Sequence, residues 1–265
     1  MSAAVFITAT GTDIGKTFVT AGLIRQISAA GGAIAAVKPI VSGFDPDAWH
    51  TSDPAVLLAA LGRPAALGEV EAISPWRFKA PLSPDLASRR EDRGIVFQDV
   101  VEFCRKSSAA NRGLLVIEGV GGVMVPLDDR RTVLDLMSVL RIPVVLVAGS
   151  YVGTISHTLT ALEIMARRNL EVVAVVVSES RESAASLEDT VATIARFADA
   201  IDVIALPRLP PGTSDHPAFA RLAGLIGWSP GRKRALDYGS RMLDPVVLRL
   251  SKSRCAFCAS LSRYF

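Results

Sequence analysis

The chain has 265 residues, of which 50% are hydrophobic, 6% aromatic and 21% charged, and its formal net charge is +3. This composition suffices for one large α/β core, and no apolar run approaches the roughly 18 residues that cross a bilayer. The N-terminus lacks the basic region of a secretory signal, and three cysteines are too few for a disulfide framework. We therefore expect a cytoplasmic protein that does not associate with a membrane.

The charge is distributed unevenly along the chain. Residues 228–265 carry eight Lys or Arg and two Asp, a net charge of +6, which leaves −3 for residues 1–227. A body with that charge is not typical of a nucleic-acid binder. We expect residues 1–227 to form one domain and residues 228–265 to be a basic C-terminal tail, whose role the sequence leaves open.

Short, β-branched, fully apolar runs alternate with helix-like stretches. Such runs suit strands covered on both faces, and we expect them at 5–9, 34–37, 114–117, 143–148, 172–177 and 203–206. The helix-like stretches are 16–30, 132–140, 156–168 and 186–197. This alternation predicts an α/β domain with a doubly wound, mostly parallel sheet and helices on both faces. The proline-rich segment 44–114 is less regular and is expected to form helices and loops over one edge.

The first predicted strand is followed by "TGTDIGKT" at 10–17. A Gly-Lys-Thr between a buried strand and a helix places backbone N–H groups and the positive end of the helix dipole against a phosphate. Lys16 would then reach the β- and γ-phosphates, and the Thr17 hydroxyl would bind Mg²⁺. The usual pattern has glycine where Thr10 stands, so the alternative is a plain strand-to-helix turn with an N-cap threonine.

Other polar residues follow the next strands. Glu118 ends a fully apolar strand before a glycine-rich turn, where P-loop proteins place a second metal-binding carboxylate. Lys38 and Ser42 lie on the loop "KPIVSG", and a cation and a hydroxyl on one loop can hold a small anion. Asp53 stands before a proline and could equally point to the metal. The alternatives are surface charges for Glu118 and Lys38 and a simple Asp-Pro helix start for Asp53.

In this order the motifs resemble those of the dethiobiotin synthetase family, ATP-dependent carboxylases that close the ureido ring in biotin synthesis. The resemblance covers roughly residues 5–227 and includes "SPWRFKAPLSP" at 74–84. The family's phosphate loop has one extra residue between its first glycine and the G-K-T, which is the spacing seen here, with Ala9 in place of that glycine. Ser178 stands where the family often has an asparagine that reads the adenine edge.

The resemblance implies a P-loop NTPase-like fold and a role for each matching residue. The implied catalytic residues are Thr12, Lys16 and Lys38. The implied nucleotide contacts are Asp13, Ile14, Gly15, Lys16, Thr17, Phe18, Ser178, Pro207 and Leu209. The implied substrate contacts are Thr12, Lys38, Ser42, Gly119, Val120, Gly121, Gly153, Thr154, Ile155 and Ser156. The implied Mg²⁺ ligands are Thr17, Asp53 and Glu118. Residues 153–156 would receive the substrate carboxylate from the neighbouring subunit of a homodimer.

The implied function is that of an ATP-dependent cyclo-ligase acting on 7,8-diaminononanoate, CO₂ and ATP, with residues 1–227 as its P-loop ATP-binding catalytic domain. Three alternatives stand beside it. A regulatory or partitioning P-loop ATPase commonly has a lysine where Gly11 stands. A cobyrinate-type amidating synthase appends a glutaminase domain, for which about 40 residues of tail are too few. The third is a non-catalytic binding module.

Overall fold

The computed structural model describes residues 3–64, 66–183, 185–210 and 215–229. Within these residues the main sheet has six strands in the order β2-β5-β1-β6-β7-β8, and every neighbouring pair is parallel. The strands are β1 (Ala4–Ala9), β2 (Ile34–Val37), β5 (Leu114–Glu118), β6 (Val144–Ala148), β7 (Val172–Ser178) and β8 (Asp202–Leu206). Each agrees with a predicted apolar run to within one residue at either end, so the expected parallel sheet is confirmed.

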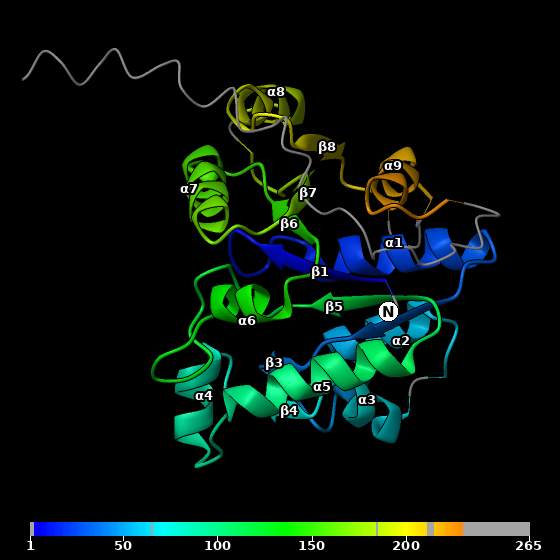
Figure 1. Cartoon of the computed structure of the whole chain (residues 1–265), viewed down its shortest axis with the longest axis vertical. Coiled ribbons are helices and arrows are strands. Elements are labelled where there is room, and N and C mark those ends of the chain that lie inside the picture. The colour runs from blue at the N-terminus through cyan, green and yellow to red at the C-terminus, as the bar shows by residue number, and fades with distance from the viewer. Residues whose placement is uncertain (1–2, 65, 184, 211–214, 230–265) are drawn as a thin grey trace, which may run out of the picture. The chain divides into compact units, whose positions relative to one another are not determined.

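The helices cover both faces of this sheet, as the predicted fold requires. The connection from β1 to β2 runs in the opposite direction across the sheet from the later ones, and right-handed crossovers that reverse direction put their helices on opposite faces. In Figure 1, α1 and α9 lie on one side of the sheet and α6 and α7 on the other. The longer helices are α1 (Lys16–Ala29), α2 (Asp53–Ala60), α5 (Phe97–Ala110), α6 (Val133–Leu140), α7 (Thr154–Arg167), α8 (Leu187–Phe197) and α9 (Pro217–Leu225).

The proline-rich segment contains a feature that the sequence did not predict. Besides α2, α3 (Leu67–Ile73), α4 (Pro84–Arg90) and a short 3₁₀ helix, η1 (Trp49–Thr51), it includes the strand β4 (Trp76–Phe78). β4 pairs in parallel with β3 (Ile40–Ser42), the chain that directly follows β2. This small second sheet holds the 74–84 segment beside the loop that follows Lys38.

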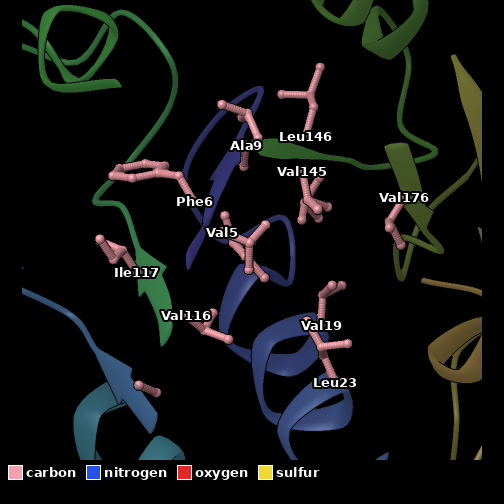
Figure 2. Close-up of a cluster of buried hydrophobic side chains, with 14 of the residues drawn as sticks. Val5, Phe6, Ala9, Val19, Leu23, Val116, Ile117, Val145, Leu146 and Val176 are labelled. Carbon is pink, nitrogen blue, oxygen red and sulfur yellow. The ribbon is translucent and has the colours of Figure 1, made fainter. Parts of the chain in front are cut away.

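The core lies on both faces of the central strands, and α1 covers one of these faces. Figure 2 shows side chains of β1, β5, β6 and β7 gathered with Val19 and Leu23 of α1. Neighbouring residues of a strand point to opposite faces, so Val5 and Phe6 are both fully buried on different sides of the sheet. Helices α1 and α9 approach so closely that a Cβ at Gly22 would lie 2.2 Å from the ring of Phe219.

Helix α6 begins with a capping box. The backbone N–H of Asp135 donates to the Thr132 hydroxyl, and the Asp135 carboxylate accepts from the Thr132 backbone N–H at 2.9 Å. These bonds satisfy N–H groups that have no acceptor inside the helix. The turn between Glu118 and α6 therefore ends at a fixed helix start.

Of the predicted tail, only Trp228 and Ser229 are among the described residues. Trp228 packs against the core, and its backbone N–H donates to Ala223 O at 2.9 Å. The predicted division at residue 227 and the rest of the tail stay predictions. Across the described part of the chain, no helix is both long and apolar enough to pass through a membrane.

Candidate active site

The fold brings the polar strand ends together. β2, β5 and β1 are adjacent in the sheet, so Lys38 after β2, Glu118 at the end of β5 and the loop after β1 meet at the same carboxyl edge. Lys38 is fixed there by its own backbone. Its N–H donates to Ile73 O at 3.0 Å, and its carbonyl accepts from the Ser74 hydroxyl at 2.6 Å.

The loop between β1 and α1 has the geometry of an anion site. Helix α1 begins at Lys16, and its N-cap is Gly15, which has φ 98° and provides no side-chain cap. The N–H groups of the first helical turn are thus left for an external acceptor, at the positive end of the helix dipole. The Lys16 ammonium is buried and donates to Gly11 O at 3.1 Å. This arrangement favours a phosphate-binding loop over a plain strand-to-helix turn capped by a threonine.

Lys38 forms ion pairs with both predicted metal carboxylates, a buried one with Glu118 and a half-exposed one with Asp53. Its ammonium lies 2.6 Å from Glu118 Oε1 and also pairs with Asp53. The Thr17 hydroxyl donates to the same Glu118 oxygen at 2.8 Å. The structure therefore brings together the three predicted metal ligands and adds a contact that the sequence did not predict, a lysine between the two carboxylates.

Burial and charge shift the pKa values of this cluster. Burial lowers the pKa of Lys38, but Glu118 and Asp53 more than offset that effect and hold it above its ordinary value. Burial raises the pKa of Asp53, but Lys38 lowers it by a larger amount, so the pKa lies below its ordinary value. Burial, followed by the charge of Lys38, lowers the pKa of Lys16 from 10.5 to about 8. The site therefore holds one firmly charged lysine and one whose charge is easily lost.

The donor set fits a hard divalent cation. Glu118 Oε2 is buried and has no hydrogen-bond partner among the described residues, so one carboxylate oxygen is left for a further ligand. Carboxylate and hydroxyl oxygens together with phosphate are the ligands that Mg²⁺ prefers. In the described part of the chain no three His, Cys, Asp or Glu side chains form a metal cluster.

Two cavities open beside the loop. The first has a volume of about 730 Å³ and is lined by Thr12, Asp13, Gly15, Lys16, Thr17, Lys38, Val41, Ser42, Gly43, Asp53, Pro81, Leu82, Ser83, Pro84, Val120, Gly121 and Val125. It gathers Lys16 and Lys38, the loop residues Thr12 and Thr17, and the carboxylates of Asp13 and Asp53. We call it the acceptor cavity.

The second cavity, of about 610 Å³, lies on the other side of Gly15. It is lined by Asp13, Ile14, Gly15, Phe18, Ser178, Glu179, Ser180, Arg181, Pro207, Arg208 and Leu209. Seven of the nine predicted nucleotide contacts lie in this lining, and the other two, Lys16 and Thr17, line the acceptor cavity. We call the second cavity the nucleoside cavity. A Cβ at Gly15 would lie 2.8 Å from Ser178 Oγ, so any side chain there would crowd Ser178 between the two cavities that share Gly15.

Some predicted residues lie elsewhere. Gly119 is buried, and its N–H donates to Ile7 O at 2.9 Å. Among the described residues, 153–156 at the start of α7 line neither the acceptor cavity nor the nucleoside cavity. The sequence reasoning did not assign Pro81, Leu82, Ser83 or Pro84 to the site, although the "SPWRFKAPLSP" motif contained the signal.

Comparison with known proteins agrees with this geometry. Residues 3–214 match a family model described as an AAA domain. Together with the parallel sheet and the loop that opens α1, this match defines a P-loop nucleotide-binding domain.

Three relatives carry the name ATP-dependent dethiobiotin synthetase BioD. One from Caulobacter vibrioides is 47% identical over 77% of this chain and 91% of its own length. One from Acidiphilium cryptum is 48% identical over 65% and 78%. One from Legionella pneumophila is 39% identical over 60% and 72%. The chain belongs to the ATP-dependent dethiobiotin synthetase family.

Among solved structures, a ParA family ATPase from Chlorobium tepidum aligns with 84% of this chain and 98% of its own, at 12% identity and a TM-score of 0.47. A likeness this distant has no bearing on function. The regulatory or partitioning ATPase is not favoured because the relatives that match most of the domain are named dethiobiotin synthetases.

Proposed function

We propose that the chain catalyses the ATP-dependent carboxylation and ring closure of 7,8-diaminononanoate with CO₂, giving dethiobiotin, ADP and phosphate. The observation that carries this proposal is the pair of cavities that meet at Gly15 and Asp13. One has the size and lining for a nucleoside, and the other contains two lysines for anionic groups. The two substrates would meet where the phosphate loop begins α1.

The chemistry requires positioning rather than a side-chain nucleophile. One amine adds to CO₂ and loses a proton to give a carbamate. A carbamate oxygen then attacks the γ-phosphorus, ADP leaves, and the second amine attacks the carbonyl carbon of the mixed anhydride and releases phosphate. Negative charge crowds at the transferred phosphoryl group, where Lys16 and the N–H groups of the α1 start can neutralise it. Holding the reactants in line contributes on the order of 7–11 kcal/mol.

Lys38 and the residues around it would hold the carbamate end. Its ammonium lines the acceptor cavity beside Ser42, whose hydroxyl is buried without a described partner. Thr12 lines the same cavity from the phosphate loop. Thr17, Asp53 and Glu118 would hold Mg²⁺, which when bound supplies positive charge to the β- and γ-phosphate oxygens.

The start of α7 would serve a neighbouring subunit. We propose that residues 153–156, at the start of α7, bind the carboxylate of a diamine held by the partner of a homodimer. The first turn of α7 carries no acidic residue, and its N–H groups favour an anion. We place this reaction in the cytoplasm.

A mass-spectrometric assay tests the function. The chain is mixed with ATP, Mg²⁺, bicarbonate and the diamine, and we expect a ureido product together with ADP and phosphate. Lys16→Ala should lower kcat by at least ~100-fold, about 2.7 kcal/mol of transition-state stabilisation. Lys106→Ala, which removes an exposed lysine of α5, is the matched control and should leave kcat unchanged. A rate of ATP hydrolysis that does not depend on the diamine would instead favour a regulatory ATPase.

A further inference from the structure

Two loops at the carboxyl edge of the sheet are joined by reciprocal hydrogen bonds. The loop at 149–153 follows β6, and the loop at 179–183 follows the adjacent strand β7. The backbone N–H of Ser150 donates to Ser180 Oγ at 3.0 Å, and the backbone N–H of Ser180 donates to Ser150 Oγ at 2.9 Å. We call this pair of residues the serine clasp.

The serine clasp is closely packed. Ser150 is 2% exposed, and the Ser183 hydroxyl also donates to its carbonyl. A Cβ at Gly149 would lie 2.8 Å from Ser180 Oγ, so the two loops meet without space for another side chain. Loss of either hydroxyl would leave a backbone N–H of the other loop without its acceptor, which buried groups tolerate poorly. The clasp therefore holds the two loops at one separation.

Each loop belongs to a different part of the proposed reaction. Glu179, Ser180 and Arg181 form one wall of the nucleoside cavity. The other loop leads into α7 and is fixed to it, because the buried Thr154 hydroxyl donates to Gly149 O at 2.8 Å. A movement of the nucleoside wall would thus displace the residues that set the start of α7.

We propose that Ser150 and Ser180 are positioning residues that couple ATP binding to binding of the diamine carboxylate at the start of α7. This inference rests on the proposed function. ATP that contacts the 179–181 wall fixes the position of that wall, the serine clasp passes this constraint to 149–153, and the start of α7 is thereby held in the position that binds the carboxylate. Linkage requires the reciprocal effect of the diamine on ATP affinity. In a homodimer the coupling runs from the nucleotide of one subunit to the diamine held by the other.

Calorimetry on the full chain measures the coupling. The Kd of 7,8-diaminononanoate is determined with Mg²⁺, with and without a saturating non-hydrolysable ATP analogue. We expect the analogue to tighten diamine binding by at least ~5-fold in the unsubstituted chain, the lower end of typical couplings. Ser150→Ala and Ser180→Ala should each reduce this ratio to below about twofold. During turnover both KM values should rise, while kcat changes less than KM because neither serine lines the acceptor cavity.

Two control variants separate coupling from a structural defect. Ser180→Thr keeps the hydroxyl oxygen and should keep the ratio. Ser138→Ala removes a hydroxyl that donates to Leu134 O in α6, away from both loops, and should leave the ratio unchanged. If the buried Ser150→Ala variant does not fold, Ser180→Ala alone decides. A ratio of one in the unsubstituted chain, or an unchanged ratio in Ser180→Ala, overturns the coupling while the function stands. A chain that binds neither ligand contradicts both.

Discussion

Replacing Lys38 by methionine tests the buried ion pair directly. Lys38 is 4% exposed and Glu118 1% exposed, so the substitution leaves a buried carboxylate with one hydroxyl donor, Thr17. Removing one partner of a buried pair costs about 3–5 kcal/mol. The Asp53 side chain is 46% exposed, and water can replace its partner, so we assign nearly all of the cost to Glu118. For a domain of this size the midpoint of thermal unfolding should fall by about 6–20 °C.

Urea unfolding in EDTA measures the change in unfolding free energy. Lys38→Met/Glu118→Gln removes the stranded charge and should recover at least half of the loss, and Mg²⁺ should stabilise Lys38→Met more than the unsubstituted chain because the cation takes the place of the ammonium. A Lys38→Met variant within about 1 kcal/mol of the unsubstituted chain would refute the reasoning, since Glu118 would then not depend on Lys38. The lowered pKa of Asp53 means that its contribution is present above pH 3.8 and lost as the pH falls below that value.

Three further predictions concern the loop, the base and the helix cap. Because burial and Lys38 lower the pKa of Lys16 to about 8, ATP binding above pH 8 must take up a proton, and the ATP Kd should rise by up to about tenfold per pH unit in calorimetry. Ser178→Asn should shift the ratio of kcat/KM for ATP against CTP and GTP by about tenfold or more, because an amide can pair with the adenine edge through two bonds; an unchanged ratio would place base reading elsewhere. Thr132→Ala should lower the unfolding free energy by about 1 kcal/mol in urea melts at pH 7. Burial raises the pKa of Asp135, but its bonds to Thr132 oppose this effect and the pKa lies below its ordinary value. The loss caused by Thr132→Ala should shrink in acid, where Asp135 becomes protonated.

Each strand of the main sheet is a short, continuous apolar run, a pattern that suits a strand covered on both faces rather than a helix. The main sheet could therefore be predicted from the sequence. The meeting of Lys38, Glu118 and the phosphate loop also followed, since parallel strands end at one edge. The short strands β3 and β4 were missed because three-residue strands carry too little pattern, and their pairing joins residues far apart in the chain. Helix α7 begins at Thr154, two residues before its predicted start, because Gly153 with φ 93° serves as its N-cap.

The contact between Lys38 and the two carboxylates could not be predicted from the sequence. Its sequence position explains why Lys38 reaches the edge of the sheet, but only the packed structure shows the ammonium 2.6 Å from Glu118. The Pro81–Pro84 wall was also missed, because the β3–β4 pairing that brings it to the cavity was not foreseen.

The boundary at Gly15 has a consequence for inhibitor design. Asp13 and Gly15 belong to the walls of both cavities, so a single compound that joins a nucleoside analogue to a diamine analogue through a short anionic linker would cross from one compartment to the other beside them. A bulkier side chain at position 15 would be one way to exclude such a compound. Here a Cβ would already lie 2.8 Å from Ser178 Oγ, and the backbone φ of 98° disfavours any residue other than glycine. A substitution that excluded the compound at this point would obstruct the natural nucleotide as well.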